Sequence, residues 1–395
     1  MKFETAMQTA ARLGVTVRAV QKWAKEGKLP GAKKVGRDWA IPFGATVSAD
    51  TELPGGAEER PDLSGLPFPL FQLPYNGGDA LEYVQNIADG DTRNINLIQM
   101  YYFMGEIEKS IELAEPYLDS SDWRYRVAAA LFYTFANLGG RHMHKTTFAA
   151  QILKRELAIN DLTDESELAD NSIRIFAAVV LKTQLHIPFE EVPLVERYIR
   201  YMPEGLRMMG CYLSAHKAYM VKDYARSLGI AQAALFSTTQ RYPVCEMYCH
   251  IISAIDHINL LQREQAAESI RRAWTIAARH RIYMPFVEHY SLLQGLIESH
   301  IKEEYPAEYD KVIRLARAYN IGWYEIYNQE NQGKVSFELI PVEFTIALLY
   351  SRNWRAKEIA AHMHISDRTV TNYIQIIYEK LNINSRKELE EFVLK

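Results

Sequence analysis

The sequence predicts a mainly α-helical protein with one small β-hairpin near its N-terminus. From about residue 79 to residue 325 the chain is nearly all compatible with amphipathic helices. Before that body, residues 45–78 contain five prolines and five glycines, which exclude long helices there. Closer to the N-terminus, Gly36 separates two short runs of β-forming residues, and this pattern is typical of a hairpin. Helices therefore dominate the predicted fold.

Four segments follow from these composition shifts. We expect a small N-terminal domain over residues 1–45 and a Pro/Gly-rich linker over residues 46–78. A helical body over residues 79–330 and a second small domain over residues 337–395 complete the chain. Residues 66–75 in the linker are too apolar for a free tether, so we expect them to dock on the helical body.

The last domain is predicted to contain four helices. Pro341 suits the first turn of a helix that runs through Tyr350, because the first amides of a helix have no intrahelical partner. A second helix over residues 356–363 ends in a turn at His364-Ile365. Ser366 then caps a third helix over residues 367–381. A capping box of Ser385 and Glu388 begins a short last helix.

The third of these helices has one apolar and one polar face. The inward positions at helical spacing are Val370, Ile374, Ile377 and Leu381. Thr371, Asn372 and Gln375 lie on the opposite, outward face. A second helix followed by a tight turn and an outward polar third helix is typical of a helix-turn-helix.

This segment resembles, over its whole length, the C-terminal domain of LuxR-type transcriptional regulators. The matching residues are Glu343, Lys357-Glu358-Ile359-Ala360, Ile365-Ser366, Thr369-Val370, Lys380-Leu381, Ser385-Arg386 and Glu388-Leu389. The resemblance implies a four-helix fold that reads double-stranded DNA with its third helix. The family usually carries Lys or Arg where this chain has Thr371 and Gln375, so it implies weaker phosphate attraction here than in its relatives.

The N-terminal domain is strongly basic. Residues 1–44 hold nine Lys or Arg against three acidic residues, whereas the full chain has a net charge of −4. We expect a helix over residues 4–13, a turn at Gly14-Val15, and a second helix over residues 17–25 capped by Thr16. Val20 and Trp23 would face inward. The hairpin follows over residues 33–42.

This segment resembles the winged helix-turn-helix of excisionases and of MerR-type readers. The matching residues are Gly14-Val15-Thr16, Val20, Trp23, Glu26-Gly27-Lys28-Leu29-Pro30, Gly36-Arg37, Trp39 and Ile41-Pro42. The resemblance implies a second DNA-binding domain. A run of charges is most often a solvated face, but here the positive excess coincides with a helix-turn-helix and a hairpin.

Both domains supply candidate DNA-contacting residues. At the N-terminus these are Thr16, Arg18, Gln21, Lys22, Lys25, Lys33, Lys34 and Arg37. At the C-terminus they are Lys357, Ser366, Arg368, Thr369, Thr371, Asn372, Gln375 and Arg386. The LuxR-type resemblance also implies a homodimer formed through the last helix, with Leu389, Phe392 and Val393 in its interface.

The helical body shows a recurring sequence pattern, in which an apolar run is followed by a small or polar turn and then by a second, amphipathic run. The turns at Gly105 and Gly139 lie 34 residues apart, and those at Asp223 and Glu264 lie 41 apart, which is in the range of helix-pair repeats. The body resembles a tetratricopeptide-type array of five to six irregular pairs, as in MalT-like regulators. Such a solenoid implies a concave surface for a ligand or partner. Residues 45–336, which contain the body, have a net charge of −10, and this argues against DNA binding by the body itself.

No catalytic or cofactor motif stands out in the sequence. There is no Walker-type GxxxxGK[ST] segment and no recognisable acid/base set. Cys245 and Cys249 lie one helical turn apart with Cys211 in the preceding repeat, but buried structural cysteines are far commoner than a metal site of this kind. An aromatic ligand pocket around Tyr212, Tyr219, Tyr248 and Trp274 competes with a plain core assignment. We expect no enzyme activity, cofactor or metal.

The cell compartment follows from two further features. No apolar run reaches the length of a membrane span, and the first residues lack the apolar core of a signal peptide. Three cysteines, an odd number in helical segments, favour a reducing cytoplasm.

These expectations favour a cytoplasmic bacterial transcriptional regulator in which a helical-repeat domain senses a small molecule, peptide or protein. The alternative is an interaction scaffold, such as an accessory factor in recombination or phage control, that binds DNA in order to localise a partner.

Overall fold

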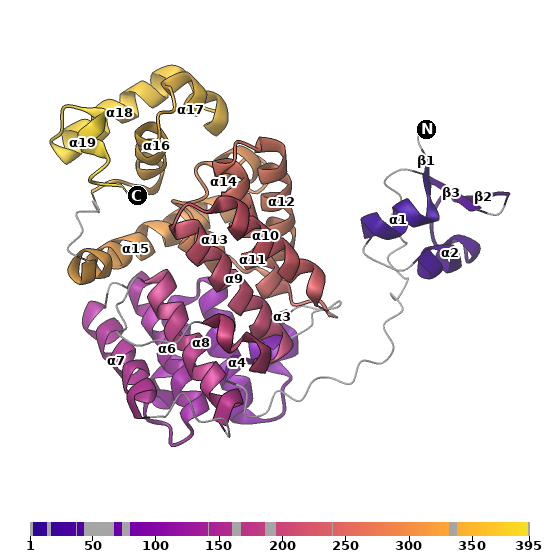
Figure 1. Ribbon diagram of the computed structural model, residues 1–395, viewed down its shortest axis with the longest axis horizontal. Coiled ribbons are helices and arrows are strands. Elements are labelled where there is room, and N and C mark those ends of the chain that lie inside the picture. Colours follow the sequence, from indigo (N-terminus) through magenta and orange to yellow (C-terminus); the bar gives the residue numbers. More distant parts are fainter. Residues whose placement is uncertain are drawn as a thin grey trace. The chain divides into compact units, whose positions relative to one another are not determined.

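The computed structural model describes residues 3–13, 17–36, 38–42, 67–72, 80–140, 142–159, 167–185, 195–238, 240–331 and 338–393. The chain forms two compact units, Met1–Arg60 and Pro61–Lys395. Helices dominate both the body and the C-terminal domain, and the described strands lie in the N-terminal unit (Figure 1). The predicted fold class is confirmed.

The N-terminal unit packs two helices on a three-stranded antiparallel sheet. Its elements are β1 (Phe3–Thr5), α1 (Ala6–Leu13), α2 (Val17–Lys25), β2 (Lys33–Val35) and β3 (Asp38–Pro42), with strand order β1-β3-β2. The expected hairpin is the β2–β3 pair, in which Val35 lies opposite Asp38. Val20, Trp23, Leu29 and Ile41 form the core of the unit.

The first helix starts two residues later than the sequence predicted. Thr5 and Gln8 form a reciprocal cap, because the Thr5 amide donates to Gln8 Oε1 at 2.9 Å and the Gln8 amide donates to Thr5 Oγ1 at 3.2 Å. The residues before the helix form strand β1, in which Glu4 lies opposite Ile41 of β3. The predicted helix over residues 4–13 is therefore wrong at its first two residues. The predicted turn at Gly14-Val15 lies outside the described residues.

The body consists of successive antiparallel helices. Its elements are η1 (Pro69–Gln72), α3 (Ala80–Gln85), α4 (Gly90–Met104), α5 (Ile107–Ala114), η2 (Glu115–Asp119), α6 (Trp123–Gly139), α7 (Met143–Ile159), α8 (Leu168–Gln184), η4 (Val195–Arg197), η5 (Ile199–Tyr201), α9 (Glu204–Met220), α10 (Tyr224–Ser237), α11 (Pro243–Asn259), α12 (Arg263–His280), α13 (Met284–Glu288), α14 (Leu296–His300) and α15 (Pro306–Asn331). Neighbouring helices pack in the pairs α4–α5, α6–α7, α9–α10 and α11–α12.

Three of these pairs share one kind of turn. Gly105, Lys222 and Leu261 each adopt a positive φ, of 75°, 63° and 62°. In each case the next amide donates to a carbonyl five residues earlier, as in a helix C-cap with a left-handed residue. The predicted turn at Gly105 is therefore correct, and the turn predicted at Asp223 is displaced by one residue. The turn predicted at Glu264 is wrong, because Glu264 lies inside α12.

The apolar part of the linker docks on the body, as predicted, within the described residues 67–72. Phe68 packs edge-on against Phe176 with ring centroids 5.3 Å apart. Phe71 lies 5.9 Å from Phe103 in the same manner. Gly205 lets this segment approach α9, since a Cβ at that position would stand 2.0 Å from the Phe71 carbonyl oxygen.

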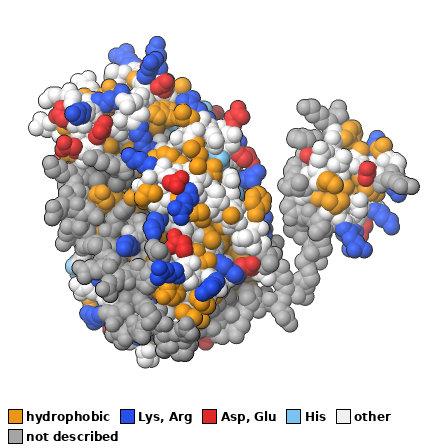
Figure 2. Space-filling model, in the orientation of Figure 1, with side chains coloured by type: hydrophobic (Ala, Val, Ile, Leu, Met, Phe, Trp, Pro, Cys, Tyr) orange, Lys and Arg blue, Asp and Glu red, His pale blue; other side chains and the backbone are white. Residues whose placement is uncertain are grey.

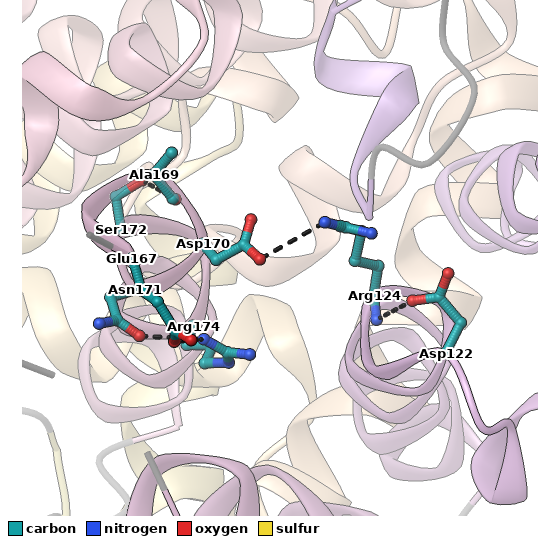
Figure 3. A network of polar contacts seen from close by, with 8 residues as sticks. All are labelled: Asp122, Arg124, Glu167, Ala169, Asp170, Asn171, Ser172 and Arg174. Carbon is teal, nitrogen blue, oxygen red and sulfur yellow. Dashed lines mark hydrogen bonds and ion pairs between the residues drawn. The ribbon is translucent and has the colours of Figure 1, made fainter. Parts of the chain in front are cut away.

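Polar contacts tie the beginning of α8 to the beginning of α6 (Figure 3). The Arg124 guanidinium lies 3.4 Å from the Asp170 carboxylate. Arg174 stacks over the Trp123 ring at 4.0 Å and is held by Asn171 Oδ1 at 2.9 Å. These contacts fix the position of the first turns of α8 relative to the first turn of α6.

Helices α13 and α15 fill the side on which the sequence predicted an open concave surface. They pack against α4, α6 and α11, each the first helix of its pair. Gly322 allows the closest approach, because a Cβ there would lie 2.6 Å from the Leu138 carbonyl oxygen. The expected open groove is therefore replaced by packed helices around a small cavity.

The C-terminal domain contains α16 (Pro341–Ser351), α17 (Ala356–Met363), α18 (Asp367–Leu381) and α19 (Arg386–Leu389). Its helix boundaries follow the prediction closely. The domain belongs to the same compact unit as the body, and it contacts the body through α16 on α15 and α17 on α14.

Candidate nucleic-acid interfaces

Helix α2 of the N-terminal unit presents a polar face to solvent. Val20 and Trp23 are buried against the sheet. Arg18, Gln21, Lys22 and Lys25 are all exposed. The ion pair of Lys22 with Glu26 is long, at 4.0 Å, and exposed, so it holds the ammonium group weakly. A face of this kind can enter the major groove of DNA.

The hairpin adds a second set of basic side chains. Lys33 and Lys34 are exposed on β2, and Gly36 at the turn adopts a φ of 63°. Figure 2 shows Lys and Arg side chains standing out from this unit. The candidate residues Thr16 and Arg37 lie outside the described residues. The described basic residues of α2 and the hairpin stand on elements that share one small apolar core.

Helix α18 of the C-terminal domain is capped and oriented as the sequence indicated. The Thr369 amide donates to Ser366 Oγ at 3.0 Å. Val370 and Ile377 are buried, whereas Ile374 is only half-buried. Thr371, Asn372 and Gln375 are exposed, so the outward face of α18 is open to solvent.

An ion pair fixes α18 against α16. Glu343 is almost completely buried, and its carboxylate accepts from Lys380 Nζ at 2.7 and 2.9 Å. The same carboxylate accepts from the Ile340 amide at 2.9 Å at the start of α16. These contacts set the angle at which α18 is presented.

Comparisons with known families agree with this geometry. Residues 343–393 match the family described as bacterial regulatory proteins, luxR family. The C-terminal domain is a luxR-family helix-turn-helix. Residues 5–44 match a helix-turn-helix domain family. No curated protein and no solved structure gives a significant match to the chain.

The chain is therefore a DNA-binding regulator with a helix-turn-helix domain at each end. Both matched segments coincide with the two domains whose polar helix faces are exposed. Neither match reaches the helical body, whose resemblance to tetratricopeptide-type sensors stays a prediction. In the described part of the chain, no helix is both long and apolar enough to span a membrane.

The other candidate residues of the luxR-family domain divide into two groups. Lys357, Ser366 and Arg368 are exposed and Thr369 is half-buried near the start of α18. Arg386 instead packs inside the domain, where its side chain donates to the Tyr350 carbonyl and, at 3.0 Å, to the Trp354 carbonyl. Its guanidinium also lies 4.2 Å from the Tyr350 ring. The side chain of Arg386 therefore holds α19 against the end of α16.

The candidate dimer residues are covered by their own chain. Leu389 and Val393 are buried, and Phe392 is half-buried against the same core. Leu389 and Val393 are therefore core residues of the single chain. Dimerisation itself stays a prediction.

The luxR-family domain docks on the body through α17 and the loop before it. His362 Nε2 bonds to the Gln294 carbonyl, and Ser299 Oγ donates to the His362 carbonyl. Trp354 lies between His362 and the guanidinium of Arg263. None of these contacts covers the outward face of α18.

Three of the four aromatic residues singled out in the sequence surround one buried polar network. Tyr248 donates to the Glu288 carboxylate at 2.7 Å, and Tyr212 bonds to His289 Nε2 at 2.7 Å. Tyr219 lines the neighbouring cavity. Trp274 lies apart, packed edge-on against Phe286.

Sequence reasoning missed the acidic centre of this network. Burial raises the pKa of Glu288 to about 7, although hydrogen bonds from Tyr102 and Tyr248 act in the opposite direction. Burial lowers the pKa of His289 to about 4, so this imidazole is neutral near pH 7. The available signal was an adjacent Glu and His inside the apolar run from Ile282 to Leu293.

The cysteines lie in apolar surroundings. Cys245 donates to the Gly205 carbonyl at 3.3 Å, and burial raises the pKa of its thiol. Burial likewise raises the pKa of Cys249. Within the described ranges, no group of three or more His, Cys, Asp or Glu side chains could hold a metal ion.

Proposed function

We propose that this protein regulates transcription by engaging double-stranded DNA with both terminal helix-turn-helix domains under the control of an effector bound by the helical body. The observation that carries the proposal is the pair of exposed polar faces on α2 and α18, each backed by a buried apolar face of the same helix. Residues 45–336, which contain the body, have a net charge of −10, which argues for a sensing rather than a DNA-binding role of the body.

At the N-terminal domain, Arg18, Gln21 and Lys22 read base edges in the major groove. Arg and Lys pair well with guanine, and Gln pairs well with adenine. Lys25, Lys33 and Lys34 contact phosphates, and Thr16 and Arg37 join this set. These contacts supply the attraction that the C-terminal domain lacks, since residues 337–395 hold equal numbers of basic and acidic side chains.

At the luxR-family domain, Thr371, Asn372 and Gln375 face the bases. Lys357 at the start of α17 contacts the DNA backbone. Ser366, Arg368 and Thr369 at the start of α18 contact it as well. Arg386 contributes by positioning α19, because its donors are engaged within the domain. Because Thr371 and Gln375 stand where the family usually carries Lys or Arg, this domain alone binds DNA weakly.

The test compares the affinity of the full chain and of two variants for DNA selected by the intact protein from genomic fragments. Arg18→Ala with Lys22→Ala removes two proposed base contacts, each of which contributes about 1 to 3 kcal/mol. The control, Arg197→Ala with Lys217→Ala, removes the same charges from exposed positions in the body. We expect a loss of specificity and at least tenfold weaker binding in the first variant only. Equal affinities of wild type and the first variant would refute the assignment.

We further propose a homodimer in which two luxR-family domains meet near α19, with half-sites related by two-fold symmetry. Leu389 and Val393 form the support beneath this surface, and Phe392 is its partly exposed member. Sedimentation equilibrium of the full chain should give twice the chain mass, and Phe392→Asp should lower it. A monomer mass at all concentrations would rule out this arrangement.

A further inference from the structure

A cavity lies inside the body where it meets the luxR-family domain. It has a volume of about 110 Å³ and is lined by parts of α8, α9, α13 and α15 and by Arg352 at the end of α16. One water needs roughly 10 to 15 Å³, and a cavity of about 150 Å³ holds a benzene ring. The space therefore suits a small organic molecule.

The walls of this cavity are mainly aromatic. Its rings are Tyr219, Tyr319, Trp323, Tyr324 and Tyr327. Trp323 and Tyr327 stack with centroids 5.0 Å apart and planes 15° apart. The Trp323 indole donates to the Gln184 carbonyl at 2.7 Å, which fixes the ring in place. Aromatic ring faces carry negative potential and attract cations.

One carboxylate lines the same cavity. Glu288 accepts from Tyr102 at 2.5 Å and from Tyr248 at 2.7 Å, and it retains part of its accessible surface. Among the side chains that the structure describes, no Lys or Arg forms an ion pair with Glu288. The cavity thus has aromatic walls and one carboxyl group. This group accepts hydrogen bonds from two tyrosines but has no cationic partner among the described side chains.

The basic residue at the cavity is already engaged. Arg352 donates to Asn259 Oδ1 at 2.7 Å and bonds to the Tyr219 hydroxyl. His216 and His289 also line the cavity, and both bond to the hydroxyl of Tyr212. Beside Glu288 the cavity therefore has aromatic and imidazole rings, and the guanidinium of Arg352 is held in place by two neutral partners.

We propose that this cavity binds a small organic ammonium ion, with its charge against Glu288 and its carbon skeleton among the aromatic rings. The proposal rests on the proposed function, in which the body senses an effector, and it gives the effector a chemical class. Cation–π attraction and the buried acid both favour a positive charge over an uncharged group of the same shape.

The cavity is placed so that its occupant also contacts the reader. Arg352 follows α16 directly, and Tyr324 in the cavity wall stacks on Phe344 of α16 with centroids 5.5 Å apart. A ligand that moves Arg352 or Tyr324 shifts the helix on which Glu343 holds α18. Ligand binding and DNA binding are thereby coupled.

The first experiment uses the full chain without DNA. Isothermal titration calorimetry is carried out with choline and tetramethylammonium, and with 3,3-dimethyl-1-butanol as the uncharged isostere of choline. We expect at least one ammonium ion to bind, with choline at least tenfold tighter than its isostere if choline is that ion. No binding by either ammonium ion, or equal binding of choline and its isostere, overturns the proposal.

Two variants locate the site. Glu288→Gln keeps hydrogen-bonding capacity toward both tyrosines but removes the charge, and we expect at least a tenfold loss of affinity for the ammonium ion. Glu298→Gln is the matched control, because Glu298 is also buried against a tyrosine hydroxyl but does not line the cavity. Quenching of Trp323 fluorescence, lost in Trp323→Leu, provides a second readout that does not depend on Glu288.

Equal losses in the two glutamate variants, or quenching unchanged in Trp323→Leu, would place the ligand elsewhere and overturn the assignment. The result is separable from the proposed function. Ammonium binding by a chain that binds no DNA would refute the regulator but not the cavity, whereas DNA binding without ammonium binding would refute only the cavity.

Discussion

Single charged side chains decide how the reading helix of the luxR-family domain is held. Glu343 is almost fully buried, and Lys380 is its cationic partner from α18. Removing only the cation leaves a buried carboxylate that, within the described part of the chain, keeps the Ile340 amide as its hydrogen-bond donor. The sequence indicated both residues through the family resemblance, but their pairing required the fold, because they lie on different helices.

Lys380→Met should therefore destabilise the chain by about 1 to 3 kcal/mol, a range lowered from that of a fully buried pair because Lys380 is about one-third exposed. Lys387→Met, at an exposed position of the same domain, is the control and should change stability by less than about 0.5 kcal/mol. Urea denaturation measures both. Equal midpoints of the two variants would mean that the ion pair does not hold α18.

Buried acids give the body a pH-dependent stability. Burial raises the pKa of Glu288 from its ordinary 4.5 to about 7, and that of Asp256 from 3.8 to about 8. Because both folded-state pKa values lie above those of the unfolded chain, the stability these groups contribute is fully present below about pH 4. It is lost progressively as the pH rises, and the loss is complete once the pH has passed 7 to 8.

We therefore expect these two groups to lower the free energy of unfolding between about pH 4 and pH 8, by up to a few kcal/mol, with no further fall above pH 8. Glu288→Gln should flatten this profile, since its amide does not titrate. Denaturation at several pH values gives the comparison. A profile of identical slope in the variant would show that Glu288 does not titrate in this range.

Whole elements show where sequence reasoning succeeded and where it stopped. The boundaries of α16, α17 and α18 followed from Pro341, from the turn at His364 and from the Ser366 cap, all of which are local signals. The roles of α13 and α15 did not, because nothing local says that α15 will pack on α6 and that α13 will pack on α4 and α11. The same long-range packing created the cavity and brought Glu288 to it.

Glycines test this packing directly. Gly322→Ala in α15 should destabilise the chain by about 1 to 3 kcal/mol, because the added Cβ would lie 2.6 Å from the Leu138 carbonyl oxygen of α6. The same substitution at Gly229 in α10 meets no atom within 4 Å and should instead stabilise the chain, by about 0.5 to 1 kcal/mol. Thermal or urea denaturation gives both signs. A neutral Gly322→Ala would contradict the close packing of α15 on α6.

At the scale of the whole molecule, charge is distributed unevenly along the chain. The first 44 residues have six more basic than acidic side chains, residues 45–336 have a net charge of −10, and the C-terminal domain is balanced. One domain therefore has strong phosphate attraction, and the other has an exposed reading face with little attraction of its own. Joining two such readers makes the second contact intramolecular, so affinity can rise by about 10² to 10⁴ when the spacing fits.

The most direct test of this account measures the affinity of the full chain for its selected DNA after each reader is disabled in turn. Arg18→Ala with Lys22→Ala disables the N-terminal reader, and Asn372→Ala with Gln375→Ala disables the luxR-family reader without touching its core. If both readers engage one DNA molecule, each variant should bind at least about 10²-fold more weakly than the intact chain. Wild-type affinity in either variant would mean that the two readers act independently, and would contradict the account.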